Sequence, residues 1–277
     1  MTVADRIDAQ RDVLPGAERR VATAVLADPE GVAFGTVAVL AARANTSGAT
    51  VVRFARRVGY DGFVELQSAV QEERLRRAAD LIRQPPPSDV VGRTLAVETD
   101  NLRRTLDGVD PKSFRRAIEL LAARRRKVYV LTGDASHGVA SLFAEELGML
   151  RPGVELVAGS GVSVGRCLAH VGPHDVAVLI DIRRYEREIV AQADEIRRRG
   201  ASIVAVTDSS ISPLTDGAVA TFVVTANGAG PFDSHVGILA LLNAVVSAVA
   251  ARLRRSATNR LDRIETAWED AASLLDV

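Results

Sequence analysis

Five short apolar runs in the second half of the chain constrain its fold more than any other feature. They are rich in β-branched residues and cover residues 128–131, 154–157, 176–180, 203–206 and 222–224. Amphipathic helical patterns separate them, and strands that alternate with helices in this way form parallel sheets covered by helices on both faces. The sequence therefore predicts an α/β domain with a parallel sheet of about five strands and a ligand crevice at their carboxyl ends.

The N-terminal part of the chain shows only helical periodicity, which predicts an all-α domain. Thr36 is a candidate N-cap for a short apolar helix over residues 37–44, and residues 45–47 form a polar turn. In the next segment Val51, Phe54 and Val58 recur at i, i+3 and i+7, which buries one face of a second helix. A supporting helix is expected from Phe63 onward. This arrangement is a helix-turn-helix.

The exposed face of the second helix is small, polar and basic, as is typical of a helix that enters the major groove of DNA. The residues expected to face bases are Ser47, Gly48, Ala49, Thr50 and Arg53. Those expected on phosphates are Arg43, Arg56 and Arg57. No acidic residue lies between Arg43 and Tyr60, so a local positive field survives in a chain with 35 basic and 35 acidic residues. The same spacing also occurs in purely structural helix pairs. Tyr60 is a candidate phosphate contact or core residue.

The length of 277 residues allows two domains. Three consecutive prolines within residues 84–88 cannot continue a helix and favour an extended spacer. The predicted organisation is a helix-turn-helix domain over residues 1–80, a proline-rich linker over 81–90 and an α/β domain over 91–277. Beyond the linker, helices are expected over residues 90–106, 234–252 and 258–275, and in the first of these the leucines at 95, 102 and 106 share one side.

The composition excludes several classes of protein. With 47% hydrophobic and 25% charged residues, the chain is globular, and Cys167 is its one cysteine, so an intramolecular disulfide is excluded. The four histidines are scattered, and neither a metal site nor a cofactor is expected. Residues 1–11 contain acids and do not form a signal peptide, and the longest apolar run, 236–251, is shorter than a membrane span. The expected location is the cytoplasm, with no membrane partner.

Two segments resemble the N-terminal domain of the RpiR family of bacterial transcription regulators. They are LPGAERRVATAVLADPEGVAF, residues 14–34, and ATVVRFARRVGYDGFVELQ, residues 49–67. The usual turn glycine is replaced by Asn45. The segment GASIVAVTDSSISPLTDGA, residues 200–218, is similar to the sugar isomerase (SIS) domain that follows in these regulators. The resemblance implies a DNA-binding domain joined to an effector-binding domain.

The resemblance also implies a site for a sugar phosphate at two loops. Gly133, Ser136 and Gly138 match the family's loop after the first strand, whereas Ala135 and His137 do not. After the third strand the family has a hydroxyl-rich loop, but this chain has residues 181–188, with the sequence DIRRYERE. Arginine binds phosphate or carboxylate through two hydrogen bonds, so the altered loop either binds an anion differently or has lost its ligand. The candidate ligand-binding residues are Gly133, Asp134, Ser136, His137, Asp181, Arg183, Arg184, Glu188 and His235.

The sequence thus predicts a regulator that binds a double-stranded DNA operator and a small anionic effector such as a phosphorylated sugar. A palindromic operator requires at least a dimer, so a homodimer or homotetramer is expected, held together by the α/β domain and the C-terminal helices. One alternative is a sugar phosphate isomerase with an accessory helical domain, in which Glu186, Glu188 or His235 would be the base. Another is a dimeric DNA-binding protein without a ligand.

Overall fold

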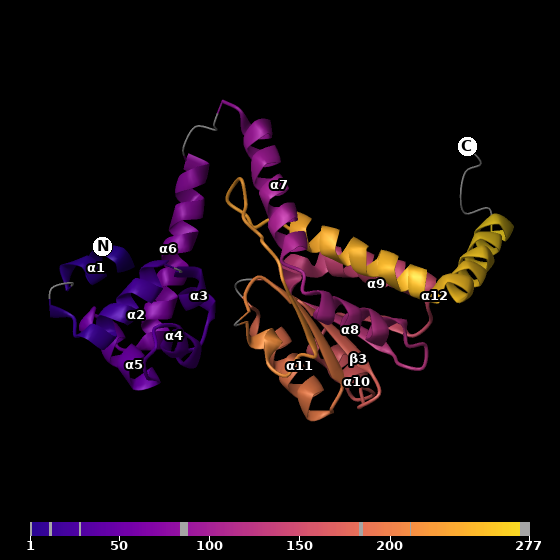
Figure 1. Ribbon diagram of the computed structural model, residues 1–277, viewed down its shortest axis with the longest axis horizontal. Coiled ribbons are helices and arrows are strands. Elements are labelled where there is room, and N and C mark those ends of the chain that lie inside the picture. The colour runs from indigo at the N-terminus through magenta and orange to yellow at the C-terminus, as the bar shows by residue number, and fades with distance from the viewer. Residues whose placement is uncertain are drawn as a thin grey trace. The chain divides into compact units, whose positions relative to one another are not determined.

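The computed structural model describes residues 2–10, 13–27, 29–83, 88–182, 185–210 and 212–271 (Figure 1). The chain divides into two compact units, one made mainly of residues 1–95 and the other mainly of residues 96–277. The first unit is helical. Its helices are α1 Val3–Ala9, α2 Gly16–Ala27, α3 Pro29–Phe34, α4 Val37–Arg43, α5 Gly48–Arg57 and α6 Phe63–Arg83.

The turn between α4 and α5 has the geometry of the predicted helix-turn-helix. The hydroxyl of Thr36 caps α4 by accepting a hydrogen bond from Val39 N, and Ser47 caps α5 in the same way through Thr50 N. Asn45 has a φ of 47°, a left-handed conformation that asparagine tolerates better than most residues. Local sequence signals therefore determine where both helices begin.

The core of the helical unit is built from the predicted apolar positions. Val21, Val51, Phe54 and Leu66 are fully buried. Tyr60 is also buried, and the Arg6 guanidinium lies 4.6 Å from the centre of its ring. Tyr60 is therefore a core residue stabilised by a cation–π contact, and it does not present its ring to a DNA phosphate.

The second unit contains the predicted five-stranded parallel sheet. Its strands are β1 Val128–Thr132, β2 Val154–Val157, β3 Val176–Ile180, β4 Ser202–Thr207 and β5 Ala220–Val223, in the spatial order β2-β1-β3-β4-β5. The last strand begins two residues before the predicted run. The strand order reverses between β1 and β3, and a ligand crevice is expected outside the carboxyl ends of these two strands.

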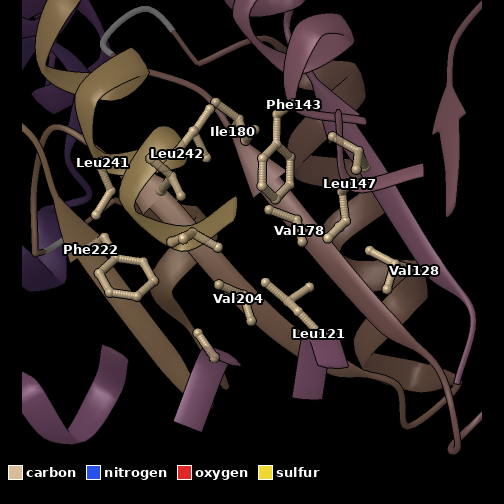
Figure 2. Close-up of a cluster of buried hydrophobic side chains, with 14 of the residues drawn as sticks. Leu121, Val128, Phe143, Leu147, Val178, Ile180, Val204, Phe222, Leu241 and Leu242 are labelled. Atoms are coloured by element: carbon tan, nitrogen blue, oxygen red, sulfur yellow. The ribbon is translucent and has the colours of Figure 1, made fainter. Parts of the chain in front are cut away.

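Helices cover both faces of the sheet. One face packs against α8 Pro111–Ala122, α9 His137–Leu150 and α12 Val236–Asp270, and the other packs against α10 Gly161–Leu168 and α11 Arg187–Arg198. Figure 2 shows the first of these clusters, in which Phe143 and Leu147 of α9 lie near Val178 of β3, and Leu241 of α12 lies near Phe222 of β5. Successive residues of the central strands β1, β3 and β4 join opposite clusters, as the two-residue period of a strand requires.

Helix α12 differs from the prediction because one element replaces two. The helix continues from Val236 to Asp270 and is interrupted only by the non-helical backbone of Arg254, with φ 11° and ψ −85°. Part of the second predicted helix, residues 272–275, lies outside the described residues. By length and composition α12 could cross a membrane, a property that core helices of soluble proteins share. Leu241, Val245 and Val249 of α12 are buried in the core.

Helix α7, Val90–Asp107, exposes the side that carries the predicted leucines at 95, 102 and 106. Asn101 and Thr105 are buried instead, because they bond to the backbone of the segment that follows β5. Asn101 exchanges hydrogen bonds with the main chain of Asn227, and Thr105 Oγ1 accepts from Thr225 N at 2.9 Å. Of the predicted linker, residues 81–83 belong to α6 and residue 90 to α7, and residues 84–87 lie outside the described part of the chain.

Arg151 closes the end of the sheet opposite the crevice. Its side chain is 1% exposed and donates to the carbonyl oxygens of Pro152, Leu121, Ala123 and Arg126. Burial lowers the pKa of the guanidinium. The four carbonyl groups lie at the end of α8 and in the turns before β1 and β2, so one side chain fastens three segments.

We predict that Arg151→Met lowers the free energy of unfolding by about 3 kcal/mol, because methionine fills the space but leaves buried carbonyl groups without donors. Urea denaturation followed by circular dichroism measures this change. Arg124→Met, at an exposed position nearby, is the control and should change stability by less than about 0.5 kcal/mol. Equal stability of the two variants would contradict the fastening role.

Candidate functional site

The N-terminal half of α5 presents the predicted base-contacting face. Ser47, Ala49 and Arg53 are exposed and Gly48 is partly exposed. Thr50 is only 4% exposed, so its predicted place on the exposed face of the helix is wrong, and its contact with a base stays an untested prediction. The Thr50 hydroxyl lies 3.0 Å from Ser47 Oγ and accepts a hydrogen bond from the Arg53 guanidinium at 3.0 Å. Thr50 therefore positions its two neighbours and does not face solvent.

The predicted phosphate-contacting arginines differ in how they are held. Arg43 and Arg56 are exposed, and Arg56 Nε donates to the carbonyl oxygen of Asp61 at 3.1 Å. Arg57 pairs with Glu18 at 2.6 Å, and Glu18 is 3% exposed. The fold thus brings a buried carboxylate to a segment that contains no acid, so Arg57 contributes less to the positive field than the sequence predicts.

One basic residue of this surface was not predicted. Arg20 of α2 donates to the carbonyl oxygens of Ala44 and Asn45, at 3.0 and 3.1 Å, and so supports the turn between α4 and α5. Arg20 precedes Ala44 by 24 residues, so no local sequence pattern indicates that it supports the turn. The helix periodicity of α2 places Arg20 on its exposed side, which was the available hint.

The second candidate site lies where β1, β3 and β5 lead into their helices. The loop after β1 contains the short 3₁₀ turn Asp134–Ser136, and α9 follows it. Asp134 N donates a hydrogen bond to Glu186 Oε1, after β3, at 2.6 Å. Ser136 is fully buried, and its Oγ lies 3.4 Å from Nε2 of His235, which precedes α12. Three segments far apart in sequence therefore meet at one edge of the sheet.

Asp181 is the buried acid of this crevice, with 2% of its surface exposed. Its oxygens accept hydrogen bonds from Ile182 N at 3.0 Å and Glu186 N at 3.4 Å. Burial is the main cause that raises its pKa to about 7, against these hydrogen bonds, and the charges of Glu186 and Asp208 act in the same direction as burial. A Cβ at Gly133 would lie 2.9 Å from both carboxylate oxygens, so only glycine leaves room for Asp181.

The structure brings five predicted residues together and leaves others apart. Gly133, Asp134, Ser136, Asp181 and His235 belong to the contacts just described. His137 and Glu188 are exposed in the first turns of α9 and α11. Arg183 and Arg184 lie outside the described residues, so their part in the site stays a prediction.

Two acidic residues were missing from the predicted ligand set. Glu186 bonds the first loop, and Asp208, directly after β4, accepts a hydrogen bond from the Tyr185 hydroxyl at 2.6 Å. Thr207 in turn donates to Tyr185 at 3.1 Å. Asp208 could have been found from the rule that polar residues at strand ends line the crevice. From the sequence, Glu186 is a candidate only for the base of an isomerase.

The described part of the crevice is acidic, since it holds Asp134, Asp181, Glu186 and Asp208. Carboxylates accept hydrogen bonds from hydroxyl groups, so this part suits the polyol portion of a ligand. A phosphate would need the arginines at 183 and 184 or the main-chain N–H groups at the start of α9. Among the described residues, no group of three or more His, Cys, Asp or Glu side chains could hold a metal ion.

The two units define a protein with a DNA-binding helix-turn-helix and a separate ligand-binding α/β domain. Residues 1–76 match the helix-turn-helix domain of the rpiR family, and residues 119–248 match the SIS domain. The HTH-type transcriptional regulator HexR of Pseudomonas aeruginosa is 30% identical over 215 residues, which cover 76% of this chain and 74% of HexR. The chain belongs to the rpiR family of helix-turn-helix transcriptional regulators.

Solved structures agree with this fold. The sugar isomerase domain of an RpiR transcription factor from Sphaerobacter thermophilus is 26% identical with a TM-score of 0.60, and the match covers 65% of this chain and 99% of that chain. NanR of Vibrio vulnificus, complexed with ManNAc-6P, is 21% identical with a TM-score of 0.73, over 98% of this chain and 99% of NanR. The likeness to NanR shows that both units of this chain have known folds.

We predict that Asp181→Asn stabilises the protein relative to wild type by an amount that grows with pH. The pKa of Asp181 is raised from 3.8 to about 7 in the folded state. The native state therefore binds the Asp181 proton more tightly than the unfolded state, and the contribution of Asp181 to stability falls as the pH rises from about 4 to about 7. Asparagine does not titrate, so the difference grows by up to about 4 kcal/mol across this window.

Urea denaturation of both proteins at about pH 5 and about pH 7.5 measures this difference, and other titrating groups cancel in the comparison. Asp216→Asn, an exposed aspartate after α11, is the matched control and should show a constant difference. A pH-independent difference for Asp181→Asn would show that the carboxyl group ionises normally.

Proposed function

We propose that this regulator binds its operator through the exposed face of α5 and that its SIS domain senses a small anionic metabolite, such as a phosphorylated sugar. Ligand binding would change operator affinity. The observation that carries the proposal is the joint presence, in one rpiR-family chain, of an exposed, basic recognition helix and a polar crevice at the strand ends. The expected site of action is the cytoplasm.

The recognition helix supports the DNA-binding part of the proposal. Residues 47–49 are small, so the backbone of α5 can approach base edges closely. Arg53 lies one turn further along on the exposed side, and its bond to Thr50 holds the guanidinium in a fixed direction. Arg43 and Arg56 are also exposed, and we propose that they contact the phosphates beside the groove.

The crevice supports the sensing part. Main-chain N–H groups at the start of α9 favour an anionic group, and Asp181 and Asp208 favour hydroxyl groups. NanR, which shares this fold, is complexed with a phosphorylated sugar. We propose that Arg183 and Arg184 replace the hydroxyl groups of the family loop as phosphate ligands, together with Ser136 and His235.

The proposal favours a regulator over an enzyme. Isomerisation of a sugar phosphate needs a free base beside the substrate carbons. Glu186 already accepts a hydrogen bond from Asp134 N, and His235 lies beside the buried Ser136. HexR, which is 30% identical to this chain over 215 residues, is named as a transcriptional regulator. We therefore propose that the crevice binds its ligand without turning it over.

We predict that Arg53→Ala weakens binding to the cognate operator by about 1–3 kcal/mol and relaxes the sequence preference at one base pair. Arg43→Ala should weaken binding to all sequences similarly. It should also reduce the slope of log affinity against log salt concentration by about one. Fluorescence anisotropy on DNA from the region upstream of the gene, or on a duplex selected from a random pool, measures both. Arg125→Ala in the SIS domain is the control. If Arg53→Ala binds selected and scrambled DNA as wild type does, α5 is not the reading helix.

We predict that the protein is at least a dimer at micromolar concentration, because a two-fold operator is read by a two-fold protein. Size-exclusion chromatography with light scattering should give a mass of about twice the chain mass of 29.5 kDa, or about four times for a tetramer. A monomeric mass would contradict this part of the proposal and would leave DNA binding by one subunit to be tested separately.

A further inference from the structure

The last part of α12 forms an arm that leaves the body of its own domain. The backbone of Arg254 interrupts the helix, and the residues after it run in a new direction, away from the sheet (Figure 1). Ala257 is buried, and the Arg260 guanidinium donates to Gly148 O of α9 at 2.9 Å. Beyond Arg260, the side-chain hydrogen bonds of the described residues stay within the helix, and residues 265–270 are all exposed. We call residues 255–270 the C-terminal arm.

The C-terminal arm carries an apolar stripe that its own domain does not fully cover. Leu261, Ile264 and Trp268 recur at i, i+3 and i+7, so they lie on one side of the helix. Leu261 and Trp268 are each 37% exposed, and Ile264 is partly exposed. Short helices are only marginally stable in water and depend on the packing of an apolar face. The stripe therefore calls for a partner surface.

The two halves of the arm have opposite charge, which indicates what the partner is. The inner half, residues 255–263, has three arginines and one acid, Asp262. The outer half, residues 264–270, has three acids and no basic residue. Two such arms that run in the same direction would place like charges together. Two arms that run in opposite directions place the acidic half of each beside the basic half of the other, and their apolar stripes face each other.

We propose that the C-terminal arm packs antiparallel against the same arm of a second copy of this chain. This inference rests on the dimer of the proposed function and assigns a surface to it. A two-fold axis beside residues 262 and 263 sets Leu261 of one copy against the partner's Ile264. It also sets Arg255 near the partner's Glu269, because these positions lie equally far from the axis. Such a contact is the same on both copies, so it closes a dimer and leaves no free end for a filament.

The test compares the full-length wild type with the double variant Leu261→Gln, Ile264→Gln. Glutamine has a helix propensity close to that of leucine but does not fill an apolar contact. Thr266→Gln is the control, because Thr266 is exposed on the opposite side of the arm. Light scattering across a concentration series measures the dissociation constant of the dimer. Trp268 is the one tryptophan of the chain, so quenching of its fluorescence by acrylamide measures how far the arm is covered.

We expect the double variant to dimerise roughly 10-fold or more weakly than wild type and Thr266→Gln do, with a folded circular dichroism spectrum. Acrylamide should then quench Trp268 in the variant as strongly as in wild type diluted to the monomer. An unchanged dissociation constant would overturn the role of the arm and leave the dimer joined through another surface. If wild type itself is a monomer at micromolar concentration, the proposed dimer fails and this inference fails with it.

The direction of the arms is tested by reversing charge in the outer half with Glu265→Lys, Glu269→Lys. In antiparallel arms this change turns an attraction between the two halves into a repulsion. We therefore expect the variant to dimerise about 3-fold or more weakly than wild type at low salt, and added sodium chloride should narrow the difference by screening. In parallel arms the same change would relieve repulsion between two acidic halves. A variant that dimerises as tightly as wild type at low salt, or more tightly, would overturn the antiparallel arrangement.

Discussion

The hydrogen-bond ladder that joins β1, β3 and β4 is the constraint on which the C-terminal unit depends. All five residues of β3 are buried, and both of its edges are paired in parallel. Water cannot reach its backbone groups, so they must bond within the sheet, and both faces must be covered by apolar helix surfaces. On β3, polar side chains are therefore expected only beyond the residues that take part in the hydrogen-bond ladder. Asp181, the first residue after β3, is such a position.

The two ends of the sheet satisfy a buried charged residue in different ways. At one end each of the three guanidinium nitrogens of Arg151 donates to the main chain, four carbonyl groups in all, so the side chain fastens turns. At the other end Asp181 accepts from two main-chain N–H groups and has further acids nearby, and its pKa is raised. Burial disfavours the charged form of both residues, but carbonyl acceptors offset this cost at Arg151, whereas the like charges near Asp181 add to it and favour protonation. The chemistry of the chain therefore concentrates at the carboxyl ends of the strands.

The predictions from sequence were right where local signals determine structure. The five strands follow from apolar runs with β-branched residues, and α4 and α5 begin at Thr36 and Ser47 because these hydroxyls cap them. Contacts between distant segments left no such signal, as with Glu18 and Arg57, which are 39 residues apart. A helical wheel predicts that Thr50 is exposed, because it shows only the positions of residues around the helix axis. It does not show that the Ser47 hydroxyl and the Arg53 guanidinium bond to the Thr50 hydroxyl and cover it.

Regulation requires that the effector bind two states of the protein with different affinity, since a ligand that binds both equally shifts nothing. An effector of this protein must therefore prefer one arrangement of the loops after β1 and β3, which the hydrogen bond from Asp134 N to Glu186 Oε1 joins directly. The free energy available for signalling cannot exceed the difference between ligand binding to these states.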